Sequence, residues 1–176
     1  ERYSKQILVK NIGGVGQKKL KSSKVLVIGL GGLGSPVVTH LSSSGIGKIG
    51  LVDNDKVDLS NLQRQFIHSV DTVGLNKTES AKIFTNRLNP NSIIYDYLID
   101  AKTPEIIEII TQYDVVIDCT DNYNTRFKVA DACQKYKKPY IFGTVRAYEG
   151  QVTTILPSTS KIKNPKIRNL FDEENI

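Results

Sequence analysis

The chain has 176 residues, of which 39% are hydrophobic and 24% charged, a composition that is typical of a globular domain and excludes a wholly disordered or fibrous protein. Its formal net charge of +6 is carried by residues 1–24, which hold seven bases and one acid, whereas the rest is balanced, so we do not expect a nucleic-acid-binding protein. The chain has no apolar run of about 20 residues, no secretory signal and only two cysteines, so we expect it to stay off membranes and to work in a reducing cytoplasm.

The predicted elements begin with an N-terminal arm. Apolar residues recur between Gln6 and Leu20 but are interrupted by glycines, which predicts two short helices within residues 1–23. Because the chain starts at Glu1 and contains no methionine, we expect residues upstream of it. Residues 158–176 are predicted to be a loop or linker tail that is incomplete in the same way.

Strands and helices then alternate along the chain. Short apolar runs predict strands, and longer segments with cap and stop signals predict helices. In chain order we expect a strand at Val25–Ile28, a helix at Gly34–Ser44, a strand at Ile49–Val52, a helix at Lys77–Leu88, a strand at Ser92–Ile99, a helix at Pro104–Thr111 capped by Thr103, a strand at Val115–Ile117, a helix at Asn124–Tyr136, a strand at Tyr140–Phe142, and a last strand around Gln151–Leu156 after a turn at Gly150.

This alternation predicts the fold class. Strands that alternate with helices are typical of an α/β fold with a Rossmann-like, doubly wound, mostly parallel sheet and helices on both faces. The last two strands have no helix between them, so we expect them to form an antiparallel edge.

A glycine-rich loop joins the first buried strand to the following helix. In Gly29-Leu-Gly-Gly-Leu-Gly34, the first glycine allows a tight turn, and Gly31 and Gly32 let the backbone come close to a ligand. Backbone N–H groups at such a helix start favour a phosphate. Asp53 follows 19 residues after Gly34, at the end of the next strand, where a carboxylate can accept both ribose hydroxyls. Strand, loop, helix and acid in this order predict a nucleotide site, but the glycines do not identify the nucleotide.

A second polar cluster, Ser60-Asn-Leu-Gln-Arg-Gln65, follows the acid. Arg64 offers a planar fork and Lys77 a point charge, and both could meet the phosphates of a triphosphate. Asn61 and Gln65 offer amides that can hold a phosphate or a metal-bound water. Arg64 alone would be interpreted as a surface base, but a cation at a predicted helix start, as at Lys77, is disfavoured without a partner.

The turn Asp118-Cys-Thr-Asp-Asn122 ends the fourth predicted strand. In an open parallel sheet that edge lines the ligand crevice. Asp121 is therefore a candidate Mg²⁺ ligand beside phosphates, with Asn122 next to it. Asp118 is equally well explained as a cap or turn residue.

Together these motifs resemble one family. The residues that carry the resemblance are Arg2-Tyr-Ser-Lys-Gln6, Gly29–Gly34, Asp53, Ser60–Gln65, Lys77 and Asp118–Asn122. They are similar to the ThiF/MoeB family, bacterial and archaeal relatives of ubiquitin-activating enzymes. The resemblance runs to about Pro157 and implies an ATP-binding adenylation domain over residues 1–157. It implies that ATP and Mg²⁺ are used to adenylate the C-terminal glycine carboxylate of a small ubiquitin-like sulfur carrier of the MoaD or ThiS type, ending in Gly-Gly, for molybdopterin or thiamine synthesis or tRNA thiolation.

The resemblance also implies residue roles. Gly31 and Gly32 would cradle phosphate, Asp53 would hold the ribose, and Asp121 would hold Mg²⁺ with Asn122 beside it. The triphosphate would be lined by Asn61, Arg64, Gln65 and Lys77. Lys5 stands where the family has an arginine that reaches across a homodimer into the neighbour's ATP site. A homodimer with Lys5, Arg64, Lys77 and Asp121 as catalytic residues is therefore expected.

The chain departs from the family at its zinc site. Pro165-Lys-Ile-Arg-Asn-Leu-Phe171 keeps the frame of the first zinc-binding pair, but Lys166 and Asn169 replace both cysteines. Lysine and asparagine do not make a thiolate zinc site, so zinc is not expected. Cys119, beside the candidate metal ligand, is expected to be a small buried filler.

Three other functions stay open. The same site could adenylate a peptide or a tRNA base. An NAD-dependent oxidoreductase would explain the glycines and Asp53 but would leave Arg64, Lys77 and Asp121 without a role. A degenerate, non-catalytic partner subunit would account for the lost zinc cysteines and for Lys5.

Overall fold

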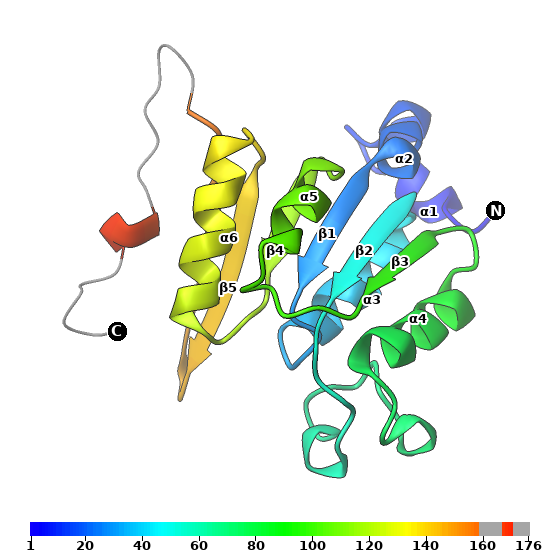
Figure 1. Cartoon of the computed structure of the whole chain (residues 1–176). Coiled ribbons are helices and arrows are strands. Elements are labelled where there is room, and N and C mark those ends of the chain that lie inside the picture. The colour runs from blue at the N-terminus through cyan, green and yellow to red at the C-terminus, as the bar shows by residue number, and fades with distance from the viewer. Residues whose placement is uncertain (159–166, 171–176) are drawn as a thin grey trace.

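The structure, a computed structural model, describes residues 1–158 and 167–170. Within them, six strands form one sheet in the order β3-β2-β1-β4-β5-β6 (Figure 1). The strands are β1 (Lys24–Ile28), β2 (Lys48–Val52), β3 (Ile93–Tyr97), β4 (Val115–Asp118), β5 (Tyr140–Arg146) and β6 (Glu149–Ile155). Neighbours are parallel except for the antiparallel edge pair β5–β6, as predicted.

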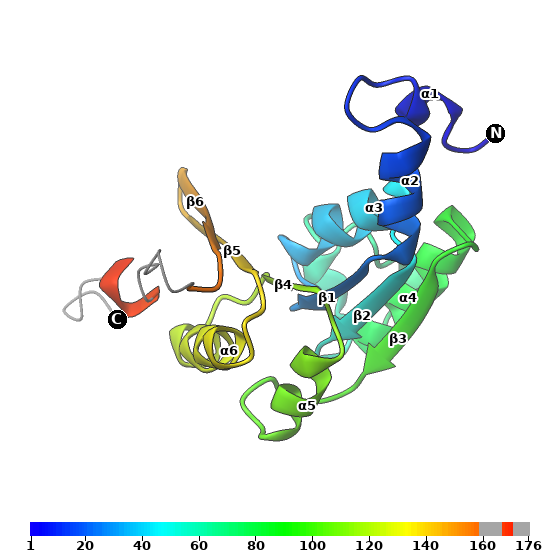
Figure 2. The same cartoon turned by 90° about the horizontal axis from the view of Figure 1, so that it is seen from above.

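Helices cover both faces of the sheet. They are α1 (Ser4–Ile7), α2 (Gly13–Ser22), α3 (Gly34–Ser44), α4 (Lys77–Leu88), α5 (Glu105–Thr111) and α6 (Tyr123–Lys135), with short 3-10 segments at Leu59–Asn61, Val70–Thr72 and Ile167–Leu170. α3 and α4 lie on one face and α5 and α6 on the other (Figure 2), so the doubly wound α/β fold is confirmed. None of the described helices is long and apolar enough to cross a membrane.

The central strand β1 is buried on both sides, because alternate side chains enter two separate cores. Val25 and Val27 pack in the cluster beneath α3 and α4, whereas Leu26 and Ile28 pack in the cluster beneath α5 and α6. A strand covered on both faces has a continuous apolar sequence, which explains why Val25–Ile28 was recognisable as a buried strand.

Two local predictions were wrong. The β5–β6 turn lies at Ala147 and Tyr148, where Ala147 adopts a left-handed φ of 52°, and Gly150 lies inside β6. Thr103 does not cap the next helix, because α5 begins at Glu105 with Pro104 in the cap position and no capping side chain.

The sheet reverses its strand order between β1 and β4, and ligands of open α/β sheets bind at such a point. There the glycine loop after β1 touches the turn after β4. A Cβ atom at Gly29, whose φ is +90°, would lie 2.9 Å from the carbonyl carbon of Cys119, so only glycine suits this position. A Cβ atom at Gly34 would overlap the carbonyl oxygen of Gly29.

This overlap gives a stability prediction. Gly34→Ala should lower the free energy of unfolding in urea by about 1–3 kcal/mol, because the loop backbone must shift to admit a methyl group. The matched control is Gly14→Ala in α2, where the added Cβ would meet no atom within 4 Å beyond its chain neighbours and its own helix backbone. It should be neutral or stabilise by up to about 1 kcal/mol. Equal unfolding midpoints for the two variants would contradict the close contact.

Candidate functional site

A cavity of about 930 Å³ opens at the carboxyl ends of the parallel strands. It is walled by the loops that follow β1, β2, β3 and β4, by the last residues of β5 and by the start of α4. Of the predicted nucleotide-binding residues it brings together Gly31, Gly32, Asp53, Arg64, Gln65, Lys77, Asp121 and Asn122. Asn61, which was predicted to line the triphosphate, is not among the lining residues.

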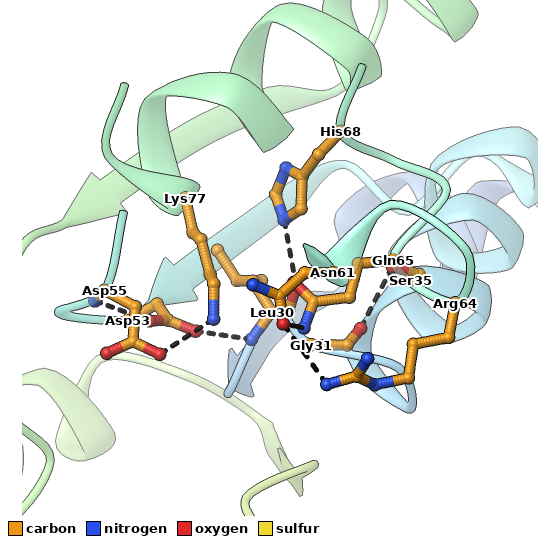
Figure 3. Close-up of polar contacts among 10 residues, drawn as sticks. All are labelled: Leu30, Gly31, Ser35, Asp53, Asp55, Asn61, Arg64, Gln65, His68 and Lys77. Carbon is orange, nitrogen blue, oxygen red and sulfur yellow. Dashed lines mark hydrogen bonds and ion pairs between the residues drawn. The ribbon is translucent and has the colours of Figure 1, made fainter. Parts of the chain in front are cut away.

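Asp53 is fixed beside the glycine loop. Its Oδ2 accepts the backbone N–H of Leu30 at 2.8 Å, and its Oδ1 accepts the N–H of Asp55 at 2.8 Å (Figure 3). Each carboxylate oxygen keeps a lone pair for a further donor. The acid therefore belongs to the loop's own hydrogen-bond network and still faces the cavity.

Asn61 does not line the cavity, but its side-chain oxygen is a hydrogen-bond acceptor that two cavity residues share. Its Oδ1 accepts from Arg64 Nη2 at 3.2 Å and from Gln65 Nε2 at 3.1 Å (Figure 3). Because arginine can only donate, the amide of Asn61 must present its oxygen here, and Gln65 must then present its nitrogen. The Oε1 atom of buried Gln65 is left without a hydrogen-bond partner among the described residues.

Lys77, the first residue of α4, is 6% exposed and already paired. Its Nζ lies 2.7 Å from Oδ2 of Asp55, and its backbone N–H donates to the carbonyl of Asp55 at 2.9 Å. Asp55 is the exposed partner, which offsets the unfavourable cation at a helix start. The ammonium group is thus held at the cavity wall by a carboxylate that solvent or a ligand can reach.

His68 ties the loop before α4 to the glycine loop. Its Nε2 lies 3.0 Å from the carbonyl oxygen of Leu30, and its Nδ1 lies 2.9 Å from Oγ of Ser80. Burial lowers the pKa of His68 below 6.5, with the charge of Lys77 acting in the same direction. Because a carbonyl can only accept, Nε2 carries a proton and donates it to Leu30, while the Ser80 hydroxyl beside Nδ1 itself donates to Thr72 Oγ1 at 2.8 Å.

The turn after β4 contributes one free carboxylate. Asp121 is exposed and faces the cavity, whereas Asp118 is fully buried and does not line it. Asn122 lines the cavity but is the N-cap of α6, since its Oδ1 accepts the N–H of Thr125 at 3.2 Å. Burial first, and then the charge of Asp118, raise the pKa of the Cys119 thiol to about 12, so this half-buried cysteine stays protonated.

Lys5 is not brought to this cavity. It lies on α1, and the neighbouring Gln6 donates from Nε2 to the carbonyl of Ser44 at the end of α3, 3.0 Å away. The arm therefore packs where α3 ends and β2 begins, at the opposite end of the strands from the cavity (Figure 1). Within one chain, Lys5 cannot join Arg64 and Lys77.

Several cavity residues were not predicted from the sequence. Asp55, Lys102, Tyr123 and Arg146 also line the cavity. The sequence held a signal for Asp55, which is an acid two residues after Asp53. The signal for Arg146 was weaker, because it is only a base at the end of a strand. Lys102 and Tyr123 had no signal beyond their position near strand ends.

The predicted loss of the zinc site falls largely outside the described part of the chain, which omits residues 165, 166 and 171 and the side chain of Asn169. Ile167 is buried against α6, and Arg168 Nη2 lies 3.1 Å from Oδ2 of Asp131. Among the described residues, no group of three or more histidine, cysteine or acidic side chains could hold a metal ion.

Comparisons with known proteins point to one family. The ThiF family model matches residues 3–175. The probable molybdopterin-synthase adenylyltransferase of Porphyra purpurea is 44% identical over 153 residues, 87% of this chain and 40% of its own. The probable adenylyltransferase/sulfurtransferase MoeZ of Mycobacterium tuberculosis is 39% identical over 172 residues, 98% of this chain and 44% of its own.

A solved structure gives the same result. A crystal structure of E. coli MccB with AMPCPP and selenomethionine-labelled MccA superposes with a TM-score of 0.81 and 28% identity, over 89% of this chain and 49% of that one. The chain thus spans less than half the length of these relatives.

The buried His68 predicts a pH dependence of stability. Its pKa is lower in the folded than in the unfolded state, so the unfolded state binds more protons between the two values. The free energy of unfolding should be at its full value above about pH 6.5 and fall as the pH drops below it towards the lowered pKa of the folded state. His68→Gln should flatten this slope, whereas His40→Gln, at an exposed position, should not. An NMR titration in which the His68 ring has its midpoint above 6.5 would contradict the assignment.

Proposed function

The chain belongs to the ThiF family, and from this premise we propose that it adenylates a carboxylate with ATP and Mg²⁺. The proposed substrate is the C-terminal glycine of a small ubiquitin-like sulfur carrier of the MoaD or ThiS type, in a molybdopterin, thiamine or tRNA thiolation pathway. One observation carries the proposal: glycine loop, ribose acid, two cations and a free carboxylate converge on one cavity. Residues 1–157 would form the adenylation domain.

Groups of this chain could contact both the ribose and the phosphates of ATP. Gly31 and Gly32 present backbone to phosphate, and Asp53 keeps acceptor capacity for the ribose hydroxyls. Lys77 would exchange part of its contact with Asp55 for a phosphate oxygen, while Arg64 offers a guanidinium that is oriented by Asn61. The cavity therefore combines a nucleoside end with a cationic phosphate end.

The proposed reaction needs no nucleophile from the protein. A carboxylate oxygen of the carrier attacks the α-phosphorus, the bond from that phosphorus to the bridging oxygen breaks, and pyrophosphate leaves. Two anions must approach each other, so Arg64 and Lys77 would offset the repulsion and stabilise the charge on the leaving group. Neither cysteine takes part, because burial raises the pKa of the Cys119 and Cys133 thiols to about 12.

The residues present fit a magnesium ion. Asp121 offers an exposed carboxylate on the cavity wall, and a bound Mg²⁺ would supply positive charge beside the phosphates. Gln65 supports the same assignment, because its orphaned Oε1 is an acceptor and would repel a phosphate oxygen. A metal-bound water, which is a donor, suits that atom.

The comparisons support the adenylation chemistry more strongly than the substrate. The relatives from Porphyra purpurea and Mycobacterium tuberculosis are named a probable molybdopterin-synthase adenylyltransferase and a probable adenylyltransferase/sulfurtransferase, and the molybdopterin and sulfur chemistry in these names favours a sulfur carrier. The likeness to MccB, solved with AMPCPP and MccA, keeps open the alternative that the same site adenylates a peptide or a tRNA base. The NAD-dependent alternative has less support, because it gives Arg64, Lys77 and Asp121 no role.

A homodimer is part of the proposal. Lys5 lies on α1, at the opposite end of the strands from the cavity of its own chain. It would therefore act on the cavity of a second copy. A lysine there keeps the charge of a cationic finger but not the bidentate fork of arginine.

Asp121→Ala should reduce ATP–pyrophosphate exchange by about 100-fold or more, because a proposed metal ligand is lost. Exchange should require Mg²⁺ and a carrier ending in Gly-Gly, and a carrier lacking those glycines should not support it. Asp71→Ala, an exposed acid outside the cavity, is the matched control. Wild-type exchange by Asp121→Ala, with unchanged thermal unfolding, would refute the metal assignment.

The role of Lys5 can be tested by complementation. Lys5→Ala and Arg64→Ala should each be impaired alone, but co-expression should restore about a quarter of wild-type exchange, since half of the dimers are mixed and each mixed dimer has one intact cavity. Lys10→Ala, another base of the arm, should be active by itself. Failure of the mixture to exceed its parents would exclude action between subunits.

A further inference from the structure

The residue before the candidate metal ligand is held by a buried carboxylate. Asp118 is 0% exposed, and its Oδ1 accepts from both the backbone N–H and the hydroxyl of Thr120, at 2.8 and 2.6 Å. Its Oδ2 accepts from the hydroxyl of Tyr140 on β5 at 2.6 Å. Three donors from two elements therefore fix the carboxylate and, with it, Thr120.

A buried cation holds the same residue from the other side. Arg126 on α6 is 1% exposed, and its Nη2 donates to the carbonyl oxygens of Thr120 and of Gly143, the latter at 3.1 Å. Its guanidinium carbon lies 5.6 Å from the ring centre of Tyr123 and 5.1 Å from that of Phe142. No carboxylate within the described residues lies within 4.0 Å of Arg126.

These two charges form a bridged pair. Isolated buried charges are costly, so Asp118 and Arg126 each require compensation. Both bond to Thr120, which gives its N–H and O–H to the anion and its C=O to the cation.

The network also positions the residues after Thr120. Asp121 comes next in the chain, and Asn122 is fixed in turn by its capping bond to Thr125. On the other side, a Cβ atom at Gly29 would lie 3.1 Å from the backbone nitrogen of Thr120, so the turn is packed against the glycine loop. Asp121 is thus an exposed side chain on a backbone whose two neighbours are fixed.

We propose that Asp118, Thr120 and Arg126 are positioning residues that hold the backbone of Asp121 at the distance from the glycine loop at which its carboxylate binds a divalent cation together with ATP. This inference rests on the proposed function and concerns three residues to which the adenylation chemistry itself gives no role. Groups that orient a metal ligand typically change metal affinity by about 10–100-fold when they are lost.

The hydroxyl of Thr120 offers the sharpest test. Thr120→Val keeps the shape and the backbone bonds but removes the O–H donor to Asp118, whereas Thr120→Ser keeps it. Binding of Mn²⁺ in the presence of ATP, followed by electron paramagnetic resonance, should weaken about 10-fold in Thr120→Val and less than about twofold in Thr120→Ser. ATP binding without metal should be the same in all three proteins.

Two outcomes would overturn the inference. One is wild-type Mn²⁺ affinity in Thr120→Val. The other is an equal loss of metal-free ATP affinity in Thr120→Val, which would indicate a general distortion of the loop. Arg126→Met and Arg126→Lys provide a second pair, with the same order of Mn²⁺ affinities expected; should Arg126→Met not fold, the Thr120 pair decides alone.

The binding assay is independent of the carrier. If wild-type protein binds Mn²⁺ with ATP but exchanges no pyrophosphate with any Gly-Gly carrier, the proposed substrate fails while the positioning role is still tested. If exchange occurs but Thr120→Val and Thr120→Ser bind Mn²⁺ with equal affinity, the positioning role fails while the proposed function stands.

Discussion

The backbone contact between the glycine loop after β1 and the turn after β4 is the constraint on which the site depends. Gly29 lies so close to Cys119 and Thr120 that a single Cβ atom would separate the two loops. The contact occurs where the strand order reverses, so it places the backbone of the glycine loop beside Asp121. Both loops are short continuations of buried parallel strands, which explains why residues about 90 positions apart in sequence can form one cavity.

The charged groups of the site are held in place before any ligand arrives. Lys77 is paired with Asp55, Arg64 is oriented by Asn61, and Asp53 is tied to the backbone of Leu30. Charged side chains that are already oriented need little rearrangement when a phosphate binds. Such prior orientation is the condition for strong electrostatic stabilisation. The buried pair of Asp118 and Arg126 extends the same principle to the loop of Asp121.

The sequence predicted those parts of the site that follow from strand ends. The glycine loop and Asp53 come directly after strands and Asp121 follows three residues after one, and parallel strands bring their carboxyl ends to one edge. It could not predict which way Asn61 faces, because this depends on Arg64 and Gln65 choosing a common acceptor. Nor could it predict the His68 contact with Leu30, which joins loops 38 positions apart, or a β5–β6 turn in which Ala147 rather than a glycine takes the left-handed conformation.

The proposed function requires that this cavity accept ATP with a divalent cation and not a dinucleotide. Isothermal titration calorimetry of the wild-type chain with ATP, with and without Mg²⁺, and with NAD⁺, separates these two possibilities. We expect that ATP binds, that Mg²⁺ tightens its binding, and that NAD⁺ neither binds comparably nor displaces ATP. Tight NAD⁺ binding, with ATP affinity indifferent to Mg²⁺, would contradict the assignment of the cavity.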